Sequence, residues 1–163
     1  MQLLYTPFHM TRVALFELPY FVRNILAVLM LAEPKGQATL LCLEGNLGAG
    51  KTTFVQTLAT ELGVKEVVQS PTYVLMKTYA LELSGPAHQT NKKFTKLVHI
   101  DAYRLESPEE FEALRPQEFL SDRQALVVVE WPEKLQGKLP KPDMTLRFSA
   151  DDMSEGERDI DAV

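Results

Sequence analysis

One glycine-rich stretch constrains the fold of this chain more than any other feature. It matches the pattern Gly-x-x-x-x-Gly-Lys-[Ser/Thr], in which glycines permit left-handed backbone and bring N–H groups close to bound phosphates. Its residues are Gly45, Asn46, Leu47, Gly48, Ala49, Gly50, Lys51 and Thr52, followed by Thr53. We therefore predict a loop that binds a nucleoside triphosphate, with Lys51 on the phosphates and Thr52 as a Mg²⁺ ligand.

The segments on either side of this loop have the pattern that such a site needs. An apolar run at 39–43 predicts a central parallel strand, because strands covered on both faces lack alternation. After the loop, apolar residues recur at helical spacing from Phe54 to Leu62, and Gly63 predicts the end of that helix. The sequence thus predicts an α/β fold in which a helix dipole faces the phosphates.

Length and composition limit the possible classes of protein. With 163 residues the chain suits one domain spanning 1–163, in which we expect 1–11 to form a loosely ordered extension. A net charge of −5 without a dense Lys/Arg block argues against a broad nucleic-acid surface, so any such role would come through a partner. The single cysteine, Cys42, cannot form an internal disulfide, which favours the cytoplasm. The apolar segment at 25–32 is far shorter than the ~20 residues of a membrane span, and we interpret it as part of a buried helix at 20–32.

Two further strands end in acidic residues. The apolar run 125–129 ends at Glu130, which predicts a buried strand with a Mg²⁺-binding carboxylate at the sheet edge. On a strand at 97–100, His99 and Asp101 point to the same face, where Asp101 could hold a water beside the nucleotide. The alternative is that this pair only caps the end of the strand.

The remaining segments carry weaker predictions. Thr72 lies in a polar loop, Ser70 to Tyr73, and either senses the nucleotide or belongs to an ordinary turn before a strand at 74–79. Patterns further along the chain predict a strand at 13–16, an exposed hairpin connection at 84–93, helices at 107–114 and 116–120, a half-buried antiparallel strand at 144–149, a turn at 151–156 and a return strand at 158–163.

Taken together, these motifs resemble the TsaE family, formerly YjeE: small bacterial ATPases required for threonylcarbamoyl modification of adenosine 37 in tRNA. The resemblance runs from about Val13 to Arg158. It rests on the loop at 45–54, Ser-Pro-Thr-Tyr at 70–73, His-Ile-Asp-Ala-Tyr-Arg at 99–104, Val-Glu-Trp-Pro at 129–132 and Gly-Glu-Arg at 156–158. The order and spacing of these motifs are more specific than the phosphate loop alone.

The resemblance implies roles for individual residues. It assigns Lys51 to the phosphates, Thr52 and Glu130 to Mg²⁺, and Asp101 to activation of the hydrolytic water. It places Thr53 beside the phosphates, Thr72 in a switch-like loop and Trp131 near the nucleotide, and it includes Gly156 and Arg158 among the nucleotide-binding residues. Asn46 departs from the Asp usual in the family, and the connection at 84–96 is longer than usual.

The resemblance also implies a fold and a function. The fold would be that of a P-loop NTPase, with a central parallel sheet flanked by antiparallel strands and helices on both faces. The function would be Mg²⁺-dependent ATP hydrolysis, slow alone, in a tRNA-modifying complex with two partner proteins; contact with tRNA would be indirect. Two alternatives remain: a small kinase acting on a small-molecule acceptor, and a nucleotide-dependent binding module without useful turnover.

Overall fold

The strand that leads into the phosphate loop lies in the middle of the sheet. In a computed structural model, which describes residues 11–33, 35–81, 93–135, 137–150 and 156–163, β2 (Thr39–Gly45) precedes the loop and α2 (Lys51–Glu61) follows it. β2 pairs in parallel with β5 (Ala125–Glu130) on one side and with β6 (Met144–Ser149) on the other. The predicted central parallel strand is thereby confirmed.

The sheet has seven strands in the order β1-β7-β6-β2-β5-β4-β3. Its parallel core is β6-β2-β5-β4, and antiparallel strands flank this core at both edges. The strands not yet introduced are β1 (Thr11–Ala14), β3 (Met76–Ala80), β4 (Lys96–Asp101) and β7 (Glu157–Ala162). Carboxyl ends of the parallel strands β2, β4 and β5 therefore meet at one edge, which is where ligands bind in such sheets.

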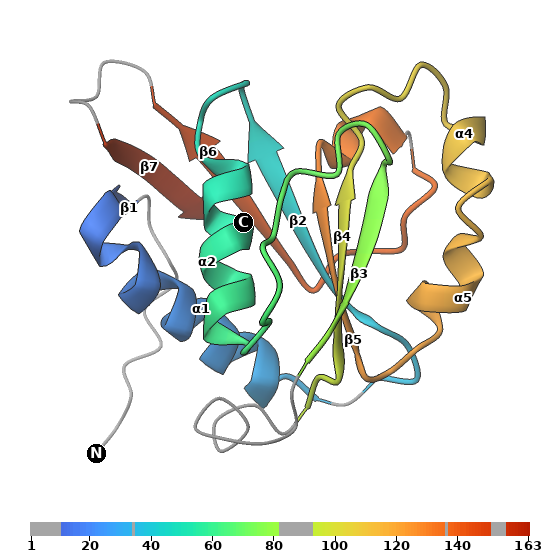
Figure 1. Cartoon of the computed structure of the whole chain (residues 1–163), viewed down its shortest axis with the longest axis horizontal. Coiled ribbons are helices and arrows are strands. Elements are labelled where there is room, and N and C mark those ends of the chain that lie inside the picture. Colours follow the sequence, from blue (N-terminus) through green and yellow to red (C-terminus); the bar gives the residue numbers. More distant parts are fainter. Residues whose placement is uncertain (1–10, 34, 82–92, 136, 151–155) are drawn as a thin grey trace.

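Helices cover both faces of the sheet. One face packs on α1 (Leu18–Leu31) and α2, and the other packs on α4 (Glu109–Glu112) and α5 (Pro116–Leu120), which Figure 1 shows well apart from α1 and α2. Along β2, Leu41 and Leu43 belong to the first apolar cluster, whereas Leu40 and Cys42 belong to the second. Successive side chains of β2 thus pack alternately into the two apolar clusters on opposite faces of the sheet. Short 3₁₀ turns, η1 (Leu15–Glu17) and η2 (Pro132–Leu135), complete the described elements.

Several predicted boundaries differ from the structure. The first strand begins at Thr11 and stops at Ala14, before the 3₁₀ turn, and the following helix begins at Leu18 rather than at residue 20. The helix predicted at 107–114 is only Glu109–Glu112, and its N-cap residue is Pro108 rather than Ser107. The Glu110 side chain accepts hydrogen bonds from the N–H groups of Glu106 and Ser107, at 3.2 Å each, and the second of these is the contact expected from Glu110 in the predicted capping box.

The prediction for 144–149 was correct in burial and half correct in direction. β6 is antiparallel to β7 but parallel to β2, because alternating polarity reports one buried face and carries no information about strand direction. Apart from their last residues, the expected extension at 1–11, the hairpin connection at 84–93 and the turn at 151–156 lie outside the described residues; Thr11 belongs to β1 rather than to an extension. Among the described residues, no helix is both long enough and apolar enough to cross a membrane.

Candidate functional site

The glycine-rich loop has the backbone that its sequence predicts. Gly48 (φ +79°) and Gly50 (φ +98°) are both left-handed, and Gly50 is the N-cap residue of α2. Left-handed turns before a helix present successive backbone N–H groups to one concave side, which suits an anion. Gly45 (φ +133°) has a separate role, because a Cβ there would lie 2.3 Å from the Phe148 carbonyl oxygen of β6.

Lys51 is the charge at the centre of this loop. Its side chain is 4% exposed, and Nζ donates to the carbonyl oxygens of Gly45 at 2.5 Å and Asn46 at 2.9 Å. The ammonium also lies 3.9 Å from the centroid of the Trp131 ring. Burial lowers the pKa of Lys51 below its ordinary value, although Glu130 and other nearby carboxylates act in the opposite direction. A bound polyanion would therefore relieve an unfavourable environment for this ammonium.

Thr52 and Glu130 meet where α2 begins and β5 ends. Leu43 of β2 is in register with Glu130, so the carboxylate lies beside the phosphate loop. Thr52 Oγ1 donates to Glu130 at 3.1 Å from Oε1 and 3.0 Å from Oε2. Within the described residues, no group of three or more His, Cys, Asp or Glu side chains could hold a metal ion. A hydroxyl and one carboxylate fit Mg²⁺, which usually takes few protein ligands and completes its shell with phosphates and waters.

Asp101 faces the same space from the end of β4. It is in register with Glu130 and only 4% exposed. Its Oδ2 accepts hydrogen bonds from Thr72 Oγ1 at 2.5 Å and Ser70 Oγ at 2.8 Å, and its Oδ1 accepts one from the Tyr103 N–H at 3.0 Å. The loop at 70–73 therefore contacts the very carboxylate that the sequence proposes for water activation.

These groups line one cavity of about 560 Å³. Predicted site residues on its wall are Leu47, Gly48, Ala49, Gly50, Lys51, Thr52, Thr53, Thr72, Asp101, Glu130 and Trp131. The cavity thus joins the carboxyl ends of β2, β4 and β5 with the start of α2. Its size is in the range of small-molecule and cofactor sites.

Other predicted residues lie elsewhere. Asn46 and Gly45 line an adjoining hollow, which Trp131 also borders. Gly156 accepts a hydrogen bond from the Leu15 N–H at 3.0 Å, so it lies where the chain leaves β1 and enters β7 rather than on the cavity wall. Arg158 is 8% exposed and packs behind the loop, where Nη1 would be 2.6 Å from a Cβ on Gly50. Direct nucleotide contact by Gly156 and Arg158 stays a prediction.

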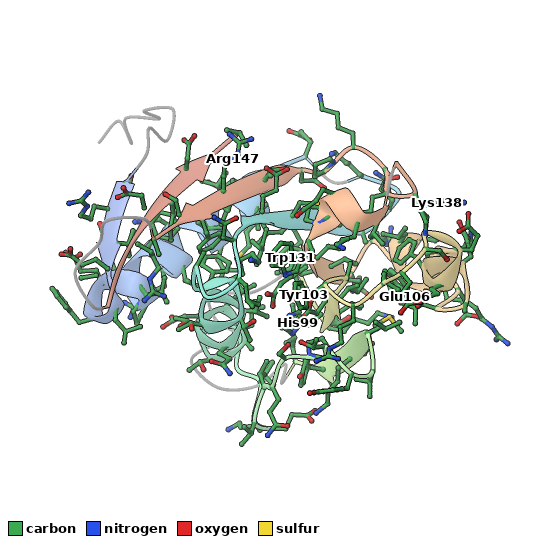
Figure 2. The ribbon with its side chains drawn as sticks, turned by 90° about the horizontal axis from the view of Figure 1, so that it is seen from above. His99, Tyr103, Glu106, Trp131, Lys138 and Arg147 are labelled. Atoms are coloured by element: carbon green, nitrogen blue, oxygen red, sulfur yellow. The ribbon has the colours of Figure 1, made fainter. Side chains whose placement is uncertain are left out.

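The cavity wall also includes Tyr73, Tyr103 and Arg104, to which the sequence reasoning gave no role in nucleotide binding. Tyr103 lies 5.0 Å from Trp131 between ring centroids, and Figure 2 shows both labelled residues in the middle of the molecule. The Arg104 guanidinium lies 4.5 Å from the centroid of Tyr73. These residues belong to the quoted motifs, so their position in the motifs was the available signal, but a short motif does not say which side chain turns toward the cavity.

Backbone strain also occurs at this site. Trp131 (φ +60°) and Leu75 (φ +64°) are non-glycine residues in left-handed conformation. The Trp131 N–H donates to the Leu43 carbonyl at 3.2 Å, and the Leu75 carbonyl accepts from the Asp101 N–H at 3.0 Å. Such strain persists only where surrounding contacts hold it, and it concentrates at functional sites.

The sequence of this chain is similar to the sequences of known proteins. The model of a family described as threonylcarbamoyl adenosine biosynthesis protein TsaE matches residues 22–160. The chain is 34% identical over 124 residues to the tRNA threonylcarbamoyladenosine biosynthesis protein TsaE of Treponema pallidum, a match that covers 76% of this chain and 81% of that protein. The corresponding protein of Haemophilus influenzae is 32% identical over 127 residues, covering 78% of this chain and 71% of its own length.

A solved structure extends the comparison to the fold. The crystal structure of YdiB from Bacillus subtilis matches with a TM-score of 0.59 and 25% sequence identity, covering 93% of this chain and 84% of that one. Agreement in family model, sequence and fold over most of the length leads to one conclusion: this chain belongs to the TsaE family.

Proposed function

We propose that this protein is a Mg²⁺-dependent ATPase that assists the synthesis of N6-threonylcarbamoyladenosine at position 37 of tRNA. The observation that carries the proposal is the convergence of Lys51, Thr52, Glu130 and Asp101 on one cavity at the carboxyl ends of three parallel strands. The printed names of the relatives, which refer to biosynthesis of this modified nucleoside, supply the biological setting. The fold is accordingly interpreted as that of a P-loop NTPase.

Each side chain has a distinct task in this proposal. The loop N–H groups and Lys51 bind the phosphates, for which Lys51 exchanges its present carbonyl partners. Thr52 and Glu130 hold Mg²⁺, which when bound neutralises charge on the phosphoryl oxygens. Asp101 orients a water for attack and accepts its proton.

The loop at 70–73 controls when Asp101 can act. Ser70 and Thr72 occupy Oδ2 of Asp101, so at least one of these hydroxyls has to turn away before that oxygen can accept a proton from water. Tyr73 and Val74, the next residues in the chain, are 83% and 64% exposed. A partner that contacts them could therefore alter the rate of hydrolysis, which suits slow turnover by the isolated chain.

The proposed setting is a cytosolic complex with two partner proteins, one of which carries the transfer chemistry. Hydrolysis would reset this complex rather than form the modification. Contact with tRNA is indirect, consistent with a chain of net charge −5. By linkage, a partner that prefers one nucleotide state must alter nucleotide affinity in return.

The test compares wild type with Lys51→Ala. The variant should lose both the binding of a fluorescent ATP analogue in the presence of Mg²⁺ and the release of phosphate. Its circular dichroism spectrum and its cooperative thermal unfolding should be retained. Lys77→Ala is the matched control, because Lys77 pairs with Glu66 at 3.0 Å outside the cavity wall and should leave binding intact.

Two results would contradict the proposal. Unchanged ATP affinity and turnover in Lys51→Ala would reject the phosphate-loop assignment. Efficient phosphate transfer to a small acceptor, together with the same partner affinity in ATP, ADP and nucleotide-free states, would favour the kinase alternative.

A further inference from the structure

A buried histidine contacts the carboxylate proposed to hold Mg²⁺. His99 is 0% exposed, and its Nε2 lies 2.8 Å from Glu130 Oε1. In the parallel pair of β4 and β5, His99 is opposite Val128 and Asp101 is opposite Glu130. His99 and Glu130 are therefore diagonal neighbours on one face of the sheet, close enough for a long side chain to reach across.

The chemistry of the two groups fixes the direction of this hydrogen bond. A carboxylate that binds Mg²⁺ is ionised and can only accept hydrogen bonds, so in that state the Nε2–H group of His99 donates a hydrogen bond to Oε1. The other ring nitrogen, Nδ1, is buried and has no hydrogen-bond partner among the described residues. A buried polar atom without a partner destabilises the fold, so an apolar residue would suit this position better if packing were its only role.

The donors to Glu130 differ in what they do when a metal binds. Thr52 donates to both carboxylate oxygens, but its hydroxyl is itself a proposed Mg²⁺ ligand. His99 approaches through β4 and lines no part of the cavity wall described above. Its hydrogen bond can consequently persist unchanged while the remaining lone pairs of Glu130 face the cavity.

We propose that His99 is a positioning residue that orients the Glu130 carboxylate for Mg²⁺. This inference rests on the proposed Mg²⁺–nucleotide function and adds a residue to it. Hydrogen bonds to metal-ligating carboxylates restrict their rotation, and loss of such partners typically weakens metal affinity about 10- to 100-fold. Replacing His99 by an apolar residue should therefore raise the Mg²⁺ concentration needed for half-maximal binding by this factor.

The experiment uses the full chain with fluorescent ADP and stepwise addition of Mg²⁺. His99→Leu removes the donor, and His99→Gln retains an N–H at similar reach. Val98→Ala is the control for general loss of packing, because Val98 is buried on the same strand but belongs to the apolar cluster on the other face. Urea unfolding of each variant measures stability separately.

The expected pattern has three parts. His99→Leu shifts the Mg²⁺ midpoint about 10- to 100-fold while leaving ADP affinity in EDTA unchanged. His99→Gln should have a Mg²⁺ midpoint close to that of wild type. Val98→Ala should lower the free energy of unfolding without changing the Mg²⁺ midpoint. If His99→Leu does not fold, His99→Asn, whose amide is too short to reach Glu130, should show the same shift.

The results separate the two proposals. A wild-type protein whose nucleotide binding does not respond to Mg²⁺ would reject the proposed function, and the role of His99 with it. A Mg²⁺-responsive wild type whose midpoint is the same in His99→Leu or His99→Asn would reject the role of His99 alone. A midpoint that moves equally in Val98→Ala would also reject it, since the effect would then follow stability.

Discussion

The contact between Arg158 and the phosphate loop predicts unequal effects of alanine at two glycines. A Cβ on Gly50 would lie 2.6 Å from Arg158 Nη1 and 3.2 Å from both Cδ and Cζ. A Cβ on Gly48 would meet nothing within 4 Å. Both glycines have positive φ, at +98° and +79°, so Gly48→Ala isolates the backbone effect and Gly50→Ala adds the steric one.

The magnitudes follow from these two contributions. Left-handed backbone costs an L-residue about 1–2 kcal/mol, which is the expected loss for Gly48→Ala. Forcing extra volume into a packed site adds about 1–3 kcal/mol, so Gly50→Ala should lose about 2–5 kcal/mol in total. The far end of an arginine could move away cheaply on a surface, but Arg158 is only 8% exposed, and its Cδ is also in the way.

Urea unfolding of the two variants, combined with Arg158→Ala, provides the assay. The double variant Gly50→Ala/Arg158→Ala should be more stable than the sum of its single changes by about 1–3 kcal/mol, because removing the guanidinium makes room for the methyl group. Equal losses for Gly48→Ala and Gly50→Ala, or a coupling energy near zero, would refute packing of Arg158 against the loop.

Two other substitutions test the chemistry of the site and of the core. Asp101→Asn keeps the size of the side chain but removes the base, so hydrolysis should slow about 10²-fold or more with Mg²⁺–ATP binding retained; turnover close to wild type in a phosphate-release assay would make Asp101 a structural cap. Burial chiefly, with help from Glu44 and Glu133, raises the pKa of Cys42 to about 12, so the native thiol should resist alkylation until urea unfolds the chain. Because the unfolded thiol loses its proton at lower pH than the native one, the free energy of unfolding should fall as pH rises from about 9 toward 12, and Cys42→Ala should lack this component. Rapid labelling of the folded protein near neutral pH would contradict the burial of Cys42.

The local parts of the site were predictable because short-range chemistry determines them. A Gly-x-x-x-x-Gly-Lys-Thr pattern after an apolar strand predicts a tight glycine-rich turn into a helix. The structure has left-handed Gly48 and Gly50 just before α2. The apolar run ending in Glu130 similarly became β5, with the acid at the expected sheet edge. Gly63 (φ +84°) follows α2 as predicted.

Contacts between distant residues could not be predicted in the same way. The alternating segment that became β6 revealed its burial, but its parallel pairing with β2 depends on where the chain crosses over. The hydrogen bond of His99 to Glu130 depends on the register of β4 with β5, and the residue pattern of one strand carries no information about its register with another. The capping box at Ser107 was predictable for the opposite reason, because it is local: the Glu110 side chain accepts the Ser107 N–H as expected, although the helix itself begins only at Glu109.

By itself, the sequence determined the elements to which we assign the chemistry: a glycine-rich loop, two strands ending in carboxylates, and polar motifs between them. Glycine conformations, apolar runs and side-chain charge act within a few residues, so they can be recognised in the linear chain. Only the tertiary structure decided that Asp101 is held by Ser70 and Thr72, and that Arg158 lies behind Gly50. These contacts depend on strand order and register, which are set by the collective burial of both faces of the sheet.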